Sequence, residues 1–398
     1  MRKRLPLIVL AIVLLAIVMR TPITAVGPLI GRIGQEYALS GTVAGLITTI
    51  PLVVFAVTSQ PIAQLAHGVG TRSVLFAGAS TLFAAILIRS IPGVAPFFIG
   101  TVLVGLGISA VNVLLPVLIK EELPLRIGVM TALYTTVMEA GSIVSSAASV
   151  PWADAIGWHA SLAVWAVPGI VACLVAWRLM RLPTLQASVG EKNALSPTPD
   201  TTGRSDRGSF FSSSAAWWLI VYMALQSLLF YCVVAWLPTL MVDKGITEQT
   251  AGYVAAFFQF LNIPGSLVTP ILAQKLHSQS VLGILSGAVY VVGLLLILTG
   301  ESLLVLLVGT ALCALCAGAS ISLAMALIGI RTRDARDSNE LSGIVQAFGY
   351  GLAALGPFAM GALFDASGSW SAPVIMLVAV AAALAVSGKF AGEPGYIR

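Results

Sequence analysis

The sequence predicts an all-α membrane protein whose twelve transmembrane helices form two pseudo-symmetric six-helix bundles. Three observations predict this fold: the composition, the number of long apolar runs, and a repeat that relates the two halves of the chain. Hydrophobic residues make up 58% of the 398 positions and charged residues only 9%. A soluble domain carries about 25% charged residues because its surface faces water. A chain with so few charges must turn most of its surface toward lipid.

Twelve apolar runs have the length that crosses a bilayer, which is about 20 residues. They lie between clusters of charged and turn-forming residues. The predicted spans are 5–30, 41–65, 73–90, 96–118, 128–150, 160–180, 216–240, 249–273, 280–299, 302–329, 342–364 and 372–391. The first run lacks a small-x-small cleavage site, so we expect it to be a membrane span and not a cleaved signal peptide.

A polar segment divides these spans six to six. Pro, Ser, Thr, Gly and charged residues dominate positions 188–214, a composition typical of a flexible linker. We therefore expect an N-terminal six-helix bundle over 1–181, a cytoplasmic linker over 182–214 and a C-terminal six-helix bundle over 215–398.

The positions of the basic residues predict the orientation of the chain. All but four of the 21 Lys and Arg residues fall on the same side as the N-terminus. Arg32, Arg89 and Lys244 fall on the opposite side, and Arg20 lies within the first span. Because cytoplasmic loops are enriched in Lys and Arg, we expect both termini in the cytoplasm and the spans in a bacterial inner membrane. The net charge of +5 then reflects orientation, and no nucleic-acid partner is expected.

Short motifs recur in the same order in the two halves. Ala63-Gln-Leu-Ala-His67 follows the second span, and Ala273-Gln-Lys-Leu-His277 follows the eighth. Thr131-Ala-Leu-Tyr-Thr135 in the fifth span parallels Ser342-Gly-Ile-Val-Gln346 in the eleventh, and the offsets lie near 210 residues. These matches indicate a duplicated six-helix unit. Many secondary transporters place their substrate site at the interface between such repeats.

Arg20 is the most informative polar residue, because a charge within hydrocarbon is costly and must be compensated. It lies too deep in the first span to belong to the basic N-terminal cluster, and Pro22 and Pro28 loosen the same helix. Its guanidinium could face a water-filled cavity and bind an anion. The alternatives are a structural pair with a buried carboxylate and a side chain that reaches the outer interface.

Glu139 is the one carboxylate well inside a predicted span, which makes it a candidate for proton coupling. The alternative is a structural ion pair, for example with Arg20. At an offset near 210 residues, Thr135 and Glu139 of the fifth span fall on Gln346 and Tyr350 of the eleventh. Each pair is spaced i, i+4 and so lies on one helix face. Two such faces could approach a central cavity from opposite sides.

Several amides and aromatic residues inside other spans are further candidates for substrate contact. They are Asn112 in the fourth span, Tyr134 in the fifth, Gln226 in the seventh and Asn262 in the eighth. Hydrogen bonding between helices is the alternative role for these amides. Trp236, at the end of the seventh span, is expected to be an interfacial anchor.

The sequence contains none of the motifs HExxH, GxSxG, the P-loop or the dinucleotide fingerprint. We therefore expect no enzyme activity, no metal and no cofactor. A chain without a P-loop does not hydrolyse ATP itself, so an ion gradient or the gradient of the substrate must drive any transport.

With twelve spans, a 6+6 duplication and a long central linker, the chain resembles the major facilitator superfamily (MFS). The loop after the second span of that family contains glycines and basic residues, matched here by Gly68, Gly70 and Arg72. His67 stands where the family has an acidic residue. The resemblance implies an MFS fold, alternating access and a gating role for this loop.

A narrower resemblance is to the cyanate permease / 2-nitroimidazole transporter (CynX/NimT) family. The stretches that carry it are Arg20-Thr-Pro-Ile-Thr-Ala-Val-Gly-Pro-Leu29, Asn112-Val-Leu-Leu-Pro-Val-Leu-Ile-Lys120, Leu133-Tyr-Thr135 and Gly343-Ile-Val-Gln-Ala-Phe-Gly-Tyr-Gly-Leu-Ala-Ala-Leu-Gly-Pro357. This resemblance implies cyanate-like anions or small nitroimidazoles as substrates, with Arg20 and Asn112 at family positions. Tyr350 or Tyr134 could stack on a nitro-heterocycle.

The leading hypothesis is a secondary carrier of a small anionic or nitro-bearing molecule, acting as a monomer in the bilayer, with H+ as a possible second partner. The alternative within transport is a proton-coupled multidrug efflux pump that uses Glu139. A membrane receptor without transport activity is the third hypothesis.

Overall fold

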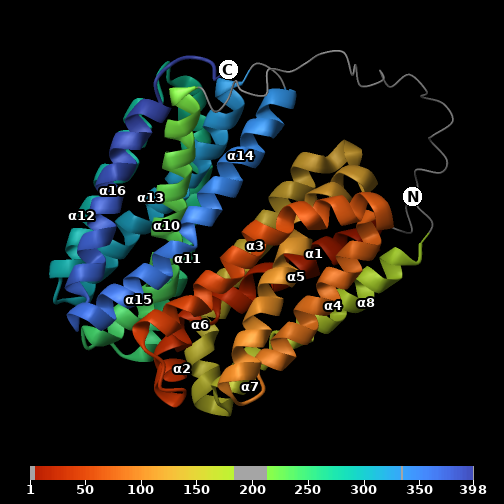
Figure 1. Ribbon diagram of the computed structural model, residues 1–398, viewed down its shortest axis with the longest axis horizontal. Helices are drawn as coiled ribbons and strands as arrows, with labels where there is room; N and C mark the ends of the chain where they lie inside the picture. Colours follow the sequence, from red (N-terminus) through yellow and green to blue (C-terminus); the bar gives the residue numbers. More distant parts are fainter. Residues whose placement is uncertain (1–4, 183–212, 333–334, 398) are drawn as a thin grey trace.

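The computed structural model describes residues 5–182, 213–332 and 335–397, all of them in helices and their connections. Among these residues, twelve helical segments are long and apolar enough to cross a membrane. The predicted twelve-helix fold is therefore confirmed. Figure 1 shows the helices in two groups that lie side by side, with both ends of the chain drawn at the same end of the molecule.

The first six spans contain helices that differ greatly in length. The first span is built from α1 (Leu5–Thr24), η1 (Gly27–Leu29) and α2 (Ile30–Glu36). The second to fourth are α3 (Gly41–Val69), α4 (Thr71–Arg89) and α5 (Val94–Glu122). The fifth joins η2 (Pro124–Arg126) to α6 (Ile127–Ile156), and the sixth joins α7 (Trp158–Ala163) to α8 (Ala166–Met180).

The second six spans begin after the central linker. The seventh to tenth are α10 (Ser214–Asp243), α11 (Glu248–Lys275), α12 (Ser280–Thr299) and α13 (Leu303–Arg331). The eleventh joins α14 (Ala335–Ala353) to α15 (Leu355–Ser367), and the twelfth is α16 (Ser371–Ala391). The predicted linker, 182–214, lies almost entirely outside the described residues, so the proposed domain boundaries stay a prediction.

The same packing scheme holds within each half. In the first half α1 packs on α6, α3 on α5 and α4 on α8; in the second α10 packs on α14, α11 on α13 and α12 on α16. The contacts between the halves are also paired, since α3 packs on α15 and α6 packs on α11. These are equivalent positions in a six-helix repeat, so the two bundles are pseudo-symmetric.

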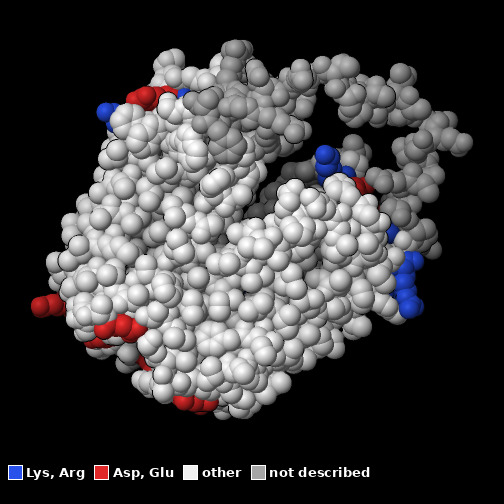
Figure 2. Space-filling model, viewed as in Figure 1, with Lys and Arg blue, Asp and Glu red and all other residues white. Residues whose placement is uncertain are grey.

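The surface agrees with a membrane-spanning protein. In Figure 2 the charged side chains gather at the two ends of the helices, and the wide band between them is uncharged. The same view shows a hollow between the bundles at the end that holds the chain termini. At the opposite end the bundles touch.

Close glycine contacts and charged groups hold the bundles together at that touching end, which we call the closed side. Gly41 of α3 and Gly361 of α15 meet backbone to backbone. Asp365 of α15 caps the start of α3, because its carboxylate accepts hydrogen bonds from the amides of Gly41 (2.7 Å) and Thr42 (2.8 Å). A carboxylate at a helix N-terminus also interacts favourably with the helix dipole.

An ion pair on the closed side joins α2 of one bundle to α11 of the other. Arg32 of α2 lies 2.7 Å from Asp154 of α6 in its own bundle, and it also pairs with Glu248 of α11 in the other bundle. Arg32 therefore bridges the two bundles.

Two spans that the sequence predicts as continuous are broken. The first span leaves regular α-helix after Thr24 and resumes as a 3-10 turn at Gly27. The eleventh breaks at Ala354, between α14 and α15. In the first case Pro28 lacks the amide hydrogen that would donate to the carbonyl of Thr24, and in the second Pro357 follows the break. Broken helices are tolerated within a membrane where they are buried in protein or line a cavity.

Candidate functional site

A chamber with a volume of about 190 Å³ lies between the bundles at the two broken spans. Its lining residues come from both halves of the chain. They are Arg20, Met138, Glu139, Gln226, Ser227, Phe230, Tyr231, Asn262, Ile321 and Tyr350. The structure thus brings together five of the predicted site residues: Arg20, Glu139, Gln226, Asn262 and Tyr350.

Arg20 is neither sealed in a tight ion pair nor directed to the lipid headgroups. Its side chain is 22% exposed, and its Nη2 atom lies 4.0 Å from Oε1 of Glu139, which is 21% exposed. The guanidinium also lies 5.2 Å from the centre of the Phe230 ring. At 4.0 Å the pair is at the limit of a salt bridge, so a ligand in the chamber can reach the guanidinium.

The two side-chain amides of the chamber differ in whether their N–H groups already have a hydrogen-bond partner. The amide nitrogen of Gln226 donates to Ser227 Oγ at 2.5 Å. Asn262 is 8% exposed, and its Nδ2 has no hydrogen-bond partner among the described residues. A buried amide donor without a partner is costly, so Asn262 presents an open donor to whatever enters. The chamber therefore offers a cation and a free N–H group.

A second cavity, about 340 Å³ in volume, adjoins the chamber at Tyr350. Asn112 of α5 and Gln346 of α14 line it, as do Phe55, Ser59 and Gln60 of α3. The rings of Phe55 and Tyr350 meet edge to face, with centroids 5.7 Å apart. This aromatic pair, with one ring from each bundle, lies where the two cavities join.

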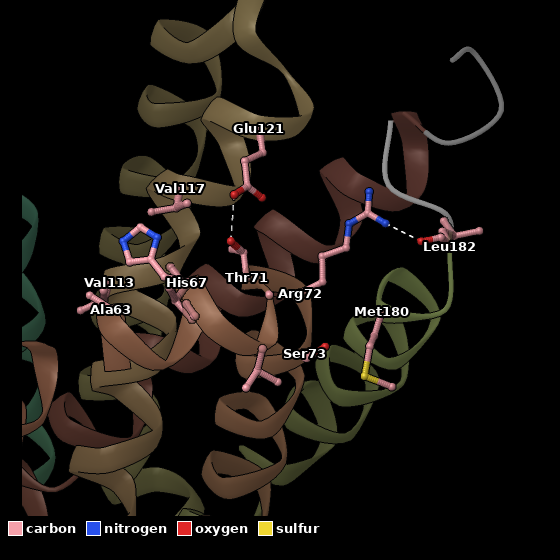
Figure 3. A pocket seen from close by; sticks show the side chains of 14 residues that line it. Ala63, His67, Thr71, Arg72, Ser73, Val113, Val117, Glu121, Met180 and Leu182 are labelled. Carbon is pink, nitrogen blue, oxygen red and sulfur yellow. Dashed lines mark hydrogen bonds between the residues drawn. The ribbon is translucent and has the colours of Figure 1, made fainter. Parts of the chain in front are cut away.

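A third cavity, about 460 Å³ in volume, shares Ala63 and Val113 with the second one. Figure 3 shows it at the ends of α3 and α5, where the ring of His67 and the carboxylate of Glu121 lie on its wall. The three cavities follow one another from Arg20 toward the end of the molecule that holds the chain termini, and each shares lining residues with the next.

The predicted gating loop lies beside this third cavity. Gly70 and Arg72 line the cavity, whereas Gly68 is exposed in the last turn of α3. Gly70 makes the turn into α4 with φ of +96°, a conformation that favours glycine. Arg72 pairs with Glu122 and donates to the carbonyl of Leu182 at 2.6 Å. In this conformation the partners of Arg72 therefore belong to the first half of the chain, and none comes from the second.

Two predicted residues lie elsewhere. Tyr134 is half-buried on α6 and lines neither the chamber nor the second cavity. The expectation that Trp236 anchors at the interface is wrong. Its side chain is buried, and its indole N–H donates to the carbonyl of Pro357 at 2.9 Å. Trp236 instead ties α10 to the start of α15.

Sequence reasoning missed the contribution of the second span. Phe55, Ser59 and Gln60 all line the second cavity. A signal was present, because Ser59 and Gln60 are adjacent polar residues within an apolar run and precede Pro61. Polar residues inside a span mark a candidate site in the same way as Arg20 does.

Twelve spans in two bundles, with a polar cavity between them, are the architecture of a membrane transporter. The sequence profile described as "Major Facilitator Superfamily" matches residues 12–338. The chain belongs to this superfamily and is a multi-pass membrane protein and a secondary transporter, not an enzyme.

Characterised and uncharacterised relatives match along nearly the whole chain. The chain is 36% identical to "Uncharacterized transporter YycB" of Bacillus subtilis (strain 168) over 98% of its length and 94% of the relative. It is 31% identical to the "2-nitroimidazole transporter" of Escherichia coli (strain K12), covering 98% and 96%. It is 26% identical to "Cyanate transport protein CynX" of the same organism, covering 91% of each. The predicted family resemblance is confirmed.

Solved structures match the fold. The crystal structure of a D-xylose-proton symporter has a TM-score of 0.74 at 14% identity and covers 97% of each chain. A structure of the xylose transporter XylE from E. coli has a TM-score of 0.76 at 13% identity and covers 97% of this chain and 96% of that one.

Proposed function

We propose that this transporter moves a small anionic or nitro-bearing molecule, such as a cyanate-like anion or a 2-nitroimidazole, across the bacterial inner membrane. The observation that carries the proposal is the loosely paired Arg20 in a small chamber between the bundles. The names of two relatives, a 2-nitroimidazole transporter and a cyanate transport protein, point to the same chemistry.

The donor set of the chamber supports this substrate class. A guanidinium presents several N–H groups in a planar fork, which suits carboxylate-like and nitro oxygens. The unpaired Asn262 amide adds a neutral donor. Phe230, Tyr231 and Tyr350 supply apolar ring surface that fits a flat heterocycle. The volume of about 190 Å³ favours molecules of a few heavy atoms.

The protein is open at one end and closed at the other, which supports transport by alternating access. With both termini in the cytoplasm, as the basic residues predict, the hollow between the bundles opens to the cytoplasm and the closed side faces outward. The described conformation is then inward-facing. To complete the transport cycle, the bundles would break their contacts on the closed side and form new contacts with each other at the cytoplasmic end.

A binding screen tests the proposed substrate class. In a thermal-shift assay of the purified protein, we expect cyanate, nitrate or 2-nitroimidazole to raise the Tm, because a ligand that binds only the folded state stabilises it. Short carboxylates test the size limit, and xylose serves as the negative control. A response to xylose alone, or to none of the small anions and nitroimidazoles, would refute the proposed class.

Glu139 gives one specific reason to add proton coupling. An anion that binds Arg20 competes with Glu139 for the same guanidinium, since both side chains line one chamber. We propose that this competition at Arg20 links the movement of a proton to the movement of the substrate, with Glu139 as the coupling residue.

Glu139→Gln is therefore expected to remove the pH dependence of transport. Uptake of the best ligand into proteoliposomes should respond to an imposed pH gradient in the wild type and should ignore it in the variant. Glu301→Gln, which changes an exposed carboxylate in a connection between spans, is the matched control and should respond as the wild type does. Undiminished coupling in the Glu139 variant would exclude this residue as the proton carrier.

A further inference from the structure

Arg89, the last residue of α4, is a cation at the end of a span, on the side opposite the N-terminus. It is buried, because the residue is 3% exposed and its guanidinium lies 4.9 Å from the centre of the Phe97 ring. Among the described residues, no carboxylate lies within 4.0 Å of it. Removal of a charged group from water costs free energy, so a buried arginine without a carboxylate partner is a candidate functional residue.

The polar partner of Arg89 is the backbone of the broken first span. Its Nη1 atom donates to the carbonyl oxygen of Pro22 at 2.7 Å. In a continuous helix that carbonyl would accept from the amide of Val26, four residues later. The Val26 amide instead donates to the carbonyl of Ile23 at 3.3 Å. The carbonyl of Pro22 has lost the Val26 amide as its hydrogen-bond donor, and the guanidinium of Arg89 takes its place.

The same break is tied to α6 from its other side. The hydroxyl groups of Thr24 and Ser145 are 2.6 Å apart, and Ser146 donates to the carbonyl of Thr24 at 3.3 Å. Thr24 in turn donates to the carbonyl of Arg20 at 3.1 Å. Through Thr24, the backbone at Arg20 is therefore held by α6, the helix that carries Glu139. Arg89 of α4 holds the same segment at Pro22.

We propose that Arg89 is a positioning residue for the substrate site: it fixes the broken end of the first span and so places the Arg20 guanidinium in the chamber. This inference rests on the proposed function, in which Arg20 holds the substrate. A charged donor makes a stronger hydrogen bond than a neutral one, and binding sites lose affinity when a supporting contact lets a key group shift by about 1 Å.

Arg331 offers a matched control within the same chain. It also ends a helix, α13, is also 3% exposed, and also donates to backbone carbonyls, those of Ala391 (3.0 Å) and Gly395 (3.1 Å). Both arginines have an Nε atom without a partner among the described residues. Arg331 lies by the C-terminal tail and lines no part of the Arg20 chamber.

The test compares Arg89→Met, Arg89→Lys and Arg331→Met in the purified full-length protein, with cyanate binding measured by calorimetry and Tm measured in parallel. Both Met variants should lower the Tm. Only Arg89→Met should raise the Kd for cyanate, by tenfold or more, and Arg89→Lys should stay within about threefold of the wild type. An unchanged Kd in a folded Arg89→Met protein would reduce Arg89 to a merely structural role.

A second measurement separates this inference from the proposed function. Hydrogen exchange of the backbone amides over 20–26 should be faster in Arg89→Met than in the wild type and unchanged in Arg331→Met. If the wild type does not bind cyanate, the proposed substrate class fails, and the exchange rates still decide whether Arg89 holds the break. Equal exchange in all three proteins would overturn the positioning role.

Discussion

Replacement of Arg20 by Gln is expected to reduce transport of the small anion strongly, by about tenfold to a hundredfold in uptake rate at low substrate concentration. The variant removes the one cation of the chamber and keeps a polar side chain of similar reach. A hydrogen bond to a charged group contributes about 1.5–3 kcal/mol, which corresponds to roughly 10–150-fold in affinity.

Arg20→Lys separates the charge from the geometry. A lysine keeps the positive charge but has no planar fork of donors, so it should restore only part of the uptake. Arg178→Gln, which removes an exposed charge from the last turn of α8, is the control and should transport normally. Uptake into proteoliposomes and the Tm of each purified variant are the measurements. Wild-type uptake by folded Arg20→Gln would remove Arg20 from the substrate site.

The second large effect is expected from Gly361→Val, which should keep the two bundles from meeting on the closed side. A Cβ atom at Gly361 would overlap the backbone of Gly41 in the other bundle, and backbone atoms cannot move aside as a flexible side chain can. The substitution also disturbs the carboxylate cap that Asp365 provides to α3, because α15 carries both residues. We expect the bundles to separate on the closed side and transport to fall to background.

Spin labels on exposed closed-side positions of the two bundles, Gln35→Cys and Gln249→Cys, can measure this separation. In the Gly361→Val protein the distance distribution should shift to longer values. Gly351→Val is the control on the same span, because a Cβ atom there meets nothing within 4 Å. A short distance retained in Gly361→Val, together with normal uptake, would show that the glycine contact does not limit closure.

The spans and their number could be predicted because the bilayer imposes a length and a composition on each helix. The breaks in the first and eleventh spans were not predicted. Pro22 was a visible signal, but a proline within a span can kink the helix or interrupt it, and the choice depends on neighbouring donors. Arg89 supplies such a donor to the carbonyl of Pro22 from another helix, and no local pattern reveals that contact.

The functional residues also divide into those that the sequence reveals and those that only the structure reveals. Arg20 and Glu139 could be found because a charge in hydrocarbon is unusual by itself. The closed-side contacts could not be found from one sequence, because Arg32 and Glu248 belong to different bundles and each looks like an ordinary residue at the end of a span. Arg89 shows the same limit: its place at the end of a span could be predicted, but its burial could not, because that depends on residues of other spans.

The meeting of two cavities at Tyr350 has a kinetic consequence. Rotation of a single side chain takes picoseconds to nanoseconds when it is not tightly packed, whereas collective domain motions take microseconds to milliseconds. Tyr350 is half-buried and contacts the rings of Phe55 and Tyr231 edge to face, with centroids 5.7 and 6.5 Å apart. Because a single ring moves faster than a whole bundle, we expect the cycle of the bundles, and not passage by the ring, to set the turnover number.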